Sequence, residues 1–143
     1  MIEVRSRIDA SPEDIWRVLV DVERWPEWTP SITRLEKLDS GDLRVGQRVR
    51  IEQPKLPTMT WAVTAVEPGR SFSWSTGRPG VTTVGTHAIA VDASGSEIRL
   101  QVDQHGVLAP LVHLLVGRRT REYMEQEAGG LKQRTEASAN HRD

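Results

Sequence analysis

The chain has 143 residues, a formal net charge of −1 and no cysteine. This length suits one domain with a sizeable core, and the small net charge gives no broad field for nucleic acid or anionic lipid. Without cysteine there is no disulfide, no thiol nucleophile and no cysteine-bound metal. No apolar run approaches the roughly 20 residues of a membrane span, and no signal peptide is visible, so we expect a soluble, cytoplasmic protein.

A strand and two helices are predicted first. Residues 2–8 alternate between apolar or small side chains and charged ones, the period of a strand with one face in water. Ser11 and Pro12 then give a helix start signal, a capping hydroxyl followed by proline at the first helical position. The Trp-Pro-Glu-Trp string at 25–28 predicts a second, short helix, because proline permits only a break or a new helical start there.

Six strands are predicted next, separated by turn residues. They cover residues 32–38, 45–53, the neighbourhoods of Trp61 and Trp74, 81–92 and 97–105. The last two should form a hairpin around a four-residue loop, with His87 opposite Val102 and Ile89 opposite Leu100.

A long C-terminal helix is predicted over residues 110–136. Pro110 suits a first helical turn, and apolar residues recur at helical spacing, so we expect the first half to face the interior: Leu108, Leu111, Val112, Leu115 and Val116. In the second half the stripe continues thinly through Thr120, Tyr123, Met124, Ala128 and Leu131. Charged residues such as Glu127 fill the other positions, which predicts one face in water.

Two glycines and the chain end interrupt this helical pattern. Gly129 and Gly130 are expected to bend or fray the helix, because each costs about 1 kcal/mol against alanine. Residues 137–143 are expected to form a loose tail. The order of elements predicts an α+β protein, β-α-α-β6-α, with a curved seven-stranded antiparallel sheet wrapped around the long helix.

Several short segments carry a family resemblance when taken in order. They are Ser11–Trp16, the Trp-Pro-Glu-Trp string, Leu43–Gly46, Gln53–Pro57, Val66–Gly69 and Gly130–Lys132. With them the chain resembles the helix-grip superfamily known as SRPBCC or START-like, and within it the polyketide cyclase/dehydrase-like lipid-binding proteins. The resemblance implies one domain over residues 1–136 and a cavity between sheet and helix for a small hydrophobic or polycyclic molecule. It does not imply catalysis, since the superfamily mixes cyclases, carriers and sensors.

Candidate cavity residues are those that share a strand phase or helix face with apolar neighbours. Trp61 and Trp74 form either a stacking wall or ordinary core, and Trp28 either a cavity mouth or a lid over the first helix. Gln53 and Gln104 are amides suited to orienting a polar group of a ligand or to satisfying backbone at a strand end. The predicted ligand-binding set is Trp28, Gln53, Trp61, Trp74, Gln104, Leu111 and Leu115.

His87 is the one candidate for acid-base chemistry, because its strand phase is that of Ile89 and it should point inward. No carboxylate shares that phase, which favours a hydrogen-bonded histidine over a catalyst. The leading hypothesis is therefore a binding module for a hydrophobic, polyketide-like or lipid-like ligand. The alternative is a polyketide cyclase or dehydratase that uses His87, and a third is an interaction domain with a filled interior.

No cofactor, metal site or nucleic-acid partner is predicted. No histidine pair has metal-ligand spacing with a third partner, and acids follow the arginine cluster at 118–121 immediately, which is typical of a solvated helix face. The pattern leaves open whether the chain is a monomer or a homodimer.

Overall fold

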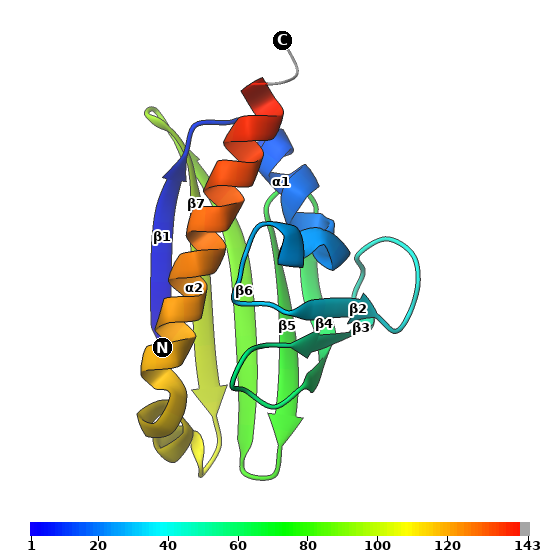
Figure 1. Ribbon diagram of the computed structural model, residues 1–143, viewed down its shortest axis with the longest axis vertical. Coiled ribbons are helices and arrows are strands. Elements are labelled where there is room, and N and C mark those ends of the chain that lie inside the picture. The colour runs from blue at the N-terminus through cyan, green and yellow to red at the C-terminus, as the bar shows by residue number, and fades with distance from the viewer. Residues whose placement is uncertain (141–143) are drawn as a thin grey trace.

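One antiparallel sheet and one long helix make up most of the protein. The computed structural model describes residues 1–140, and its seven strands follow the order β1-β7-β6-β5-β4-β3-β2. The elements are β1 (Ile2–Ile8), α1 (Pro12–Val20), the 3-10 helix η1 (Val22–Glu27), β2 (Arg34–Lys37), β3 (Arg48–Glu52), β4 (Met59–Glu67), β5 (Ser71–Arg78), β6 (Val81–Asp92), β7 (Gly95–His105) and α2 (Ala109–Asn140). Figure 1 shows α2 crossing the face of the curved sheet, so the predicted helix-grip α+β fold is confirmed.

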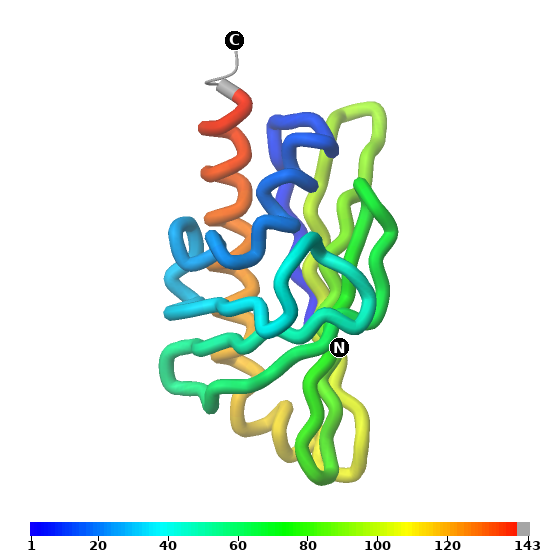
Figure 2. Tube along the Cα trace, turned by 90° about the vertical axis from the view of Figure 1, so that its right-hand side faces the viewer, coloured from blue at the N-terminus to red at the C-terminus, as the bar shows by residue number. Residues whose placement is uncertain are grey.

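The two short helices fill one end of the interior. Ser11 caps α1 as predicted, since its Oγ accepts a hydrogen bond from the backbone N–H of Asp14 at 3.2 Å. In η1 the indole N–H of Trp25 donates to the carbonyl of Leu19 at 2.9 Å, and Trp25 is only 1% exposed. Figure 2 shows α1, in blue, between the C-terminal half of α2 and the sheet, so this end has a continuous core.

The β6–β7 hairpin pairs in a different register from the predicted one. Asp92 is opposite Gly95, the loop is only Ala93 and Ser94, and His87 is opposite Leu100 instead of Val102. The carboxylate of Asp92 accepts hydrogen bonds from the N–H and hydroxyl of Ser94 at 2.8 and 2.7 Å, which stabilises the tight turn. The error is two residues, and because side chains alternate with period two, every residue keeps its predicted face.

The predicted burial of the first half of α2 is wrong for its leucines. Leu111 is 50% exposed and Leu115 is 70% exposed. The buried residues of α2 lie in its second half, where Met124, Ala128 and Leu131 pack against the core. Both halves carry apolar residues at helical spacing, but the α2 residues of the buried core among residues 1–140 all come from the second half.

The helix is also longer and more regular than predicted. It continues past Glu136 to Asn140, so residues 137–140 are helical rather than a loose tail, and residues 141–143 lie outside the described part of the chain. Gly129 and Gly130 are both helical. A methyl group at Gly130 would overlap the carbonyl oxygen of Trp28, whereas nothing lies within 4 Å of one at Gly129. Gly130 therefore permits the close approach of α2 to the loop after η1.

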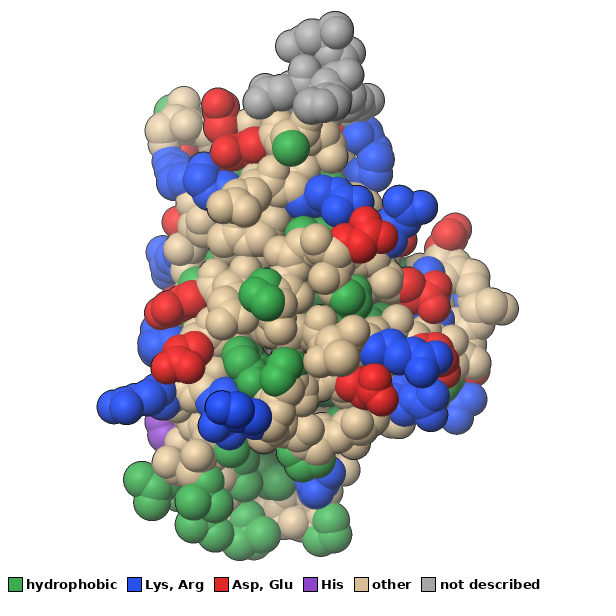
Figure 3. Space-filling view, in the orientation of Figure 1, with side chains coloured by type: hydrophobic (Ala, Val, Ile, Leu, Met, Phe, Trp, Pro, Cys, Tyr) green, Lys and Arg blue, Asp and Glu red, His purple; other side chains and the backbone are tan. Residues whose placement is uncertain are grey.

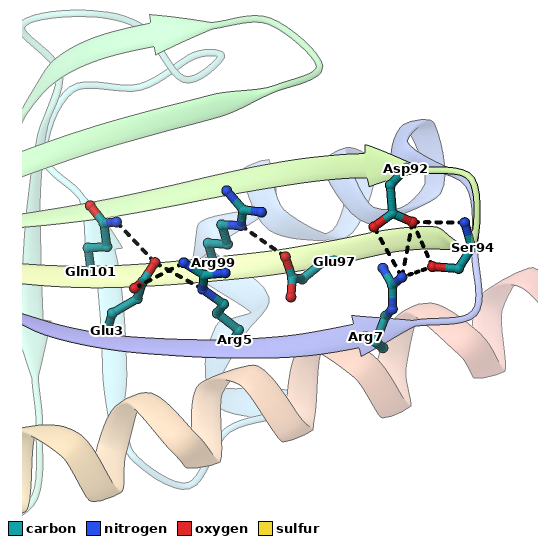
Figure 4. A network of polar contacts seen from close by, with 8 residues as sticks. All are labelled: Glu3, Arg5, Arg7, Asp92, Ser94, Glu97, Arg99 and Gln101. Atoms are coloured by element: carbon teal, nitrogen blue, oxygen red, sulfur yellow. Dashed lines mark hydrogen bonds and ion pairs between the residues drawn. The ribbon is translucent and has the colours of Figure 1, made fainter.

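Polar side chains along the N-terminal edge of the sheet form a network (Figure 4). On β1 and β7, Gln101 donates to the carboxylate of Glu3 at 3.2 Å, and this hydrogen bond with the neighbouring Arg5 lowers the pKa of Glu3. At the β6–β7 turn, hydrogen bonds from Ser94 and the nearby Arg7 guanidinium lower the pKa of Asp92. These contacts link the edge strand β1 to its neighbours, although exposed pairs of this kind contribute little stability individually.

Alanine substitutions at the two adjacent glycines should have opposite effects. Gly129→Ala should raise the free energy of unfolding by up to about 1 kcal/mol, because it improves helix propensity in open space. Gly130→Ala should lower it by more than about 1 kcal/mol, because backbone atoms at Trp28 must move. Urea denaturation of both variants measures the difference; equal effects would mean that the helix does not need Gly130 for its approach.

Leucine-to-alanine substitutions along α2 should separate its two halves. Leu131 is fully buried, so Leu131→Ala should cost about 2 to 5 kcal/mol of unfolding free energy. Leu115→Ala should change it by less than about 0.5 kcal/mol, as is usual at a surface position. Comparable losses in chemical denaturation would contradict the burial of the two side chains described above.

Candidate functional site

A cavity of about 280 Å³ lies between the sheet and α2, at the end that α1 and η1 do not fill. Its walls come from β3 to β7, from the loop between β3 and β4, and from one face of α2. The α2 face is a continuous helical stripe, at intervals of four or three residues: Val112, Val116, Thr120, Tyr123 and Glu127. Two lining residues are exposed, Pro57 and Arg78, and they mark the mouth of the cavity.

Aromatic side chains form the sheet side of this cavity. The rings of Trp61 and Trp74 lie 6.1 Å apart, and Trp25 lies 5.3 Å from Trp74 at the inner end. Gly85 on β6 makes room for this wall, since a methyl group there would lie 3.2 Å from the indole nitrogen of Trp74. The arrangement offers flat apolar surfaces against which an aromatic or alicyclic ligand can stack.

One polar pair, His87 and Glu127, is buried at the inner end of the cavity. The imidazole is 5% exposed and stacks on Phe72, with ring centroids 4.3 Å apart. Its Nδ1 lies 3.3 Å from the carbonyl oxygen of Phe72, and its Nε2 lies 3.4 Å from Oε1 of Glu127 on α2. Phe72 and Glu127 thus hold the two ring nitrogens in place from opposite sides.

The contact between His87 and Glu127 leaves one carboxylate oxygen of Glu127 without a hydrogen-bond partner among residues 1–140. A carbonyl only accepts, so Nδ1 carries its proton toward Phe72 and Nε2 is the nitrogen that faces Glu127. The 3.4 Å separation is within ion-pair reach but long for a hydrogen bond, and Oε1 is buried without a hydrogen-bond partner among the described residues. An unsatisfied buried carboxylate oxygen is costly, and a donor group on a ligand would satisfy it.

The predicted site residues divide into two groups in space. Gln53, Trp61, Trp74, His87 and Gln104 all line the cavity. The amide N–H of Gln53 donates to the carbonyl of Ser31 at 3.3 Å, so part of this side chain is committed to the backbone.

The other three predicted residues lie elsewhere. Leu111 and Leu115 point to the surface, and Val112 and Val116 take the cavity face of the helix in their place. Trp28 does not line the cavity; it packs beside Gly130, with its ring 5.4 Å from that of Trp25. The predicted apolar stripe held Val112 and Val116 together with both leucines, because the run of apolar residues at 111–116 does not by itself indicate which of them are buried.

Sequence reasoning missed Glu127, which was assigned to the water-facing side of the helix. Its signal was the spacing: Glu127 follows Tyr123 by four residues, on the stripe that includes Thr120 and Val116. Tyr123 was predicted on the apolar stripe but not among the ligand-binding residues; its hydroxyl donates to the carbonyl of Pro54 and so joins α2 to the loop at the mouth. Among residues 1–140, no group of three or more His, Asp or Glu side chains could hold a metal ion.

A curved sheet, a long gripping helix and an apolar cavity between them define a helix-grip protein of the SRPBCC class. The chain belongs to the family described as "Polyketide cyclase / dehydrase and lipid transport", whose model matches residues 1–136. No match was found among curated protein sequences.

Solved structures from several organisms have the same fold as this chain. A hypothetical protein from Helicobacter pylori superposes with a TM-score of 0.76 at 15% identity, over 94% of this chain and 85% of the other. A Thermus thermophilus protein gives 0.75 at 17% identity over 96% and 98%. Major latex-like protein 151 from Panax ginseng gives 0.72 at 11% identity over 94% and 95%. At these identities the similarity establishes the fold.

Occupation of the cavity should be visible in tryptophan emission. Titration with an amphipathic dye such as anilinonaphthalene sulfonate should quench or shift the emission, and Trp61→Phe should reduce this response, because Trp61 lines the cavity. Trp28→Phe is the matched control and should preserve the response. A response that survives in Trp61→Phe but disappears in Trp28→Phe would mean that the probe binds near η1 instead.

Proposed function

We propose that the protein binds a compact apolar molecule with one hydrogen-bond donor, and that it does so as a carrier, sensor or accessory factor. The observation that carries the proposal is the buried, unsatisfied Oε1 of Glu127 beside His87 in an otherwise largely apolar cavity. An apolar body would stack on the tryptophan wall, and a hydroxyl or N–H at its end would donate to Glu127.

The size of the cavity supports a compact ligand. At about 280 Å³ it lies at the small end of the roughly 300 to 1,000 Å³ typical of pockets for drug-sized molecules. The residues that narrow it are Trp25 and Met124, which close the inner end. A one- to three-ring hydroxylated molecule suits this space better than a long acyl chain.

A matched pair of probes tests the donor requirement. Naphthol should bind more tightly than naphthalene, by roughly tenfold to a hundredfold, as expected for a hydrogen bond to a charged group. Glu127→Gln should remove most of this difference, and Glu125→Gln, an exposed change on the same helix, should preserve it. Isothermal titration measures both affinities; equal binding of the two probes to the unmodified protein would contradict the proposed role of Glu127.

The His87–Glu127 contact also favours a second candidate, an enzyme of the cyclase or dehydratase type. His87 has no carboxylate in its own strand phase, but α2 supplies one, with Oε1 of Glu127 3.4 Å from Nε2. A histidine oriented by a carbonyl on one nitrogen and facing a carboxylate with the other is suited to moving a proton to or from a bound substrate.

Binding and turnover must be measured together to separate the two candidates. If the protein is an enzyme, His87→Gln should lower turnover of a hydroxylated polyketide-like substrate by on the order of 10² to 10⁴ while naphthol still binds. If it is a carrier, neither the unmodified protein nor His87→Gln converts the substrate. Native mass spectrometry of the freshly purified protein would identify the class of any retained ligand.

A further inference from the structure

The end of the molecule that holds the mouth of the cavity has an unusual surface. Five apolar side chains there are between 42% and 88% exposed. They come from the turn before α2 and from its first two turns: Val107, Leu108, Leu111, Leu114 and Leu115, here named the apolar tip. Figure 3 shows apolar side chains gathered at this lower end of the molecule. Contiguous exposed apolar surface of this kind marks an interaction site.

The apolar tip is held in place by backbone contacts with the β5–β6 turn. The N–H of Leu108 donates to the carbonyl of Gly80 at 2.9 Å, and the N–H of Val112 donates to Leu108 at 3.0 Å to begin the helix. Gly106 approaches so closely that a methyl group on it would overlap the carbonyl oxygen of Gly80. The exposed leucines therefore project from an ordered turn of helix.

Positive side chains follow the apolar tip on α2 and occur on two segments near it, the end of β5 and the β3–β4 loop. They are Lys55, Arg78, Arg118, Arg119 and Arg121, here named the basic collar. Arg119 approaches the carbonyl of Lys55 at 3.5 Å, which places the β3–β4 loop beside this part of the helix. No aspartate or glutamate occurs from residue 104 to residue 121; the nearest in sequence are Asp103 and Glu122.

The basic collar differs from most of the other basic residues among residues 1–140 in forming no ion pair. Elsewhere most arginines pair with carboxylates, as Arg7 does with Asp92 and Arg48 with Asp39. Among residues 1–140, no member of the basic collar forms an ion pair. The net charge of −1 thus conceals a local excess of positive charge at this end.

We propose that the apolar tip and the basic collar dock the protein onto an anionic lipid surface. Exposed leucines on the first turns of a helix can enter the headgroup boundary, while arginines behind them remain at the level of the phosphates. Basic residues beside an apolar anchor strengthen attachment to anionic lipids. Attachment is peripheral, since no helix among residues 1–140 is long and apolar enough to cross a membrane.

Charge complementarity favours the lipid surface over a second copy of the chain. A two-fold dimer through the apolar tip would bring two basic collars together, and the stretch from 104 to 121 offers no carboxylate to pair with them. The position is also suitable for ligand exchange, because Val112 and Val116 line the cavity while Leu111 and Leu115, one residue away on the helix, face outward. The docking proposal does not require the cavity to be occupied.

Vesicle sedimentation tests the proposal with the full chain. The protein should sediment with phosphatidylcholine vesicles that contain phosphatidylserine, at least about tenfold more strongly than with phosphatidylcholine alone, and less as salt rises. Leu114→Gln/Leu115→Gln and Arg118→Gln/Arg119→Gln should each lower the partition coefficient by roughly tenfold or more. The control Val45→Gln/Val91→Gln removes two valines of similar exposure, 63% and 61%, away from the tip and should bind as the unmodified protein does.

Three results would overturn the proposal. The first is absence of binding to either vesicle, and the second is equal binding by the leucine variant and the control. The third is a dimer in light scattering that the leucine variant converts to monomer, which would make the tip a contact between copies. Naphthol titration of the same samples keeps the two proposals separate. Vesicle binding without naphthol binding would support docking and contradict the proposed function. Naphthol binding without vesicle binding would contradict docking.

Discussion

The interior of this protein depends on the position of Trp25. Its indole is fixed by a hydrogen bond to the carbonyl of Leu19 and contacts Trp74 and His87, with ring centroids 5.3 Å away in both cases. A curved sheet and one helix leave more space between them than the helix side chains can fill. Trp25 on η1 fills that space at one end of the interior and does not extend to the other end. The other end remains open as the cavity, and the same indole forms part of its inner wall.

The polar chemistry of the site lies at this boundary between filled and open interior. His87 is buried among aromatic rings, with one ring nitrogen beside the carbonyl of Phe72 and the other facing Glu127. Glu127 faces it from α2, where Met124 and Ala128 on either side are buried in the core. A buried polar pair in a largely apolar cavity would orient the proposed ligand: the apolar part of the ligand would supply affinity, and its donor would select one orientation.

The two halves of the long helix α2 have different roles in the structure. Its C-terminal half closes the core, and Gly130 lets it lie against the backbone at Trp28. In its N-terminal half one side lines the cavity, and the opposite side exposes leucines to solvent. The proposed docking surface and the proposed binding site are therefore two faces of the same few turns. Movement of this part of the helix would affect both.

Local pattern alone was sufficient for the elements and the faces of the strands. Alternation set which residues of β3 to β7 point inward, and that result survived a two-residue error in the β6–β7 register because strand side chains repeat every two residues. The helix pattern was less exact. Its apolar stripe correctly included Val116, Met124 and Leu131, but it also placed Leu111 and Leu115 inward and left Glu127 on the side in water. Successive residues of a helix are about 100° apart, so an apolar run does not define the edges of the buried face. Only the tertiary structure decided those edges, through the close contact at Gly130 and the packing of Leu131, and with them the carboxylate that faces His87.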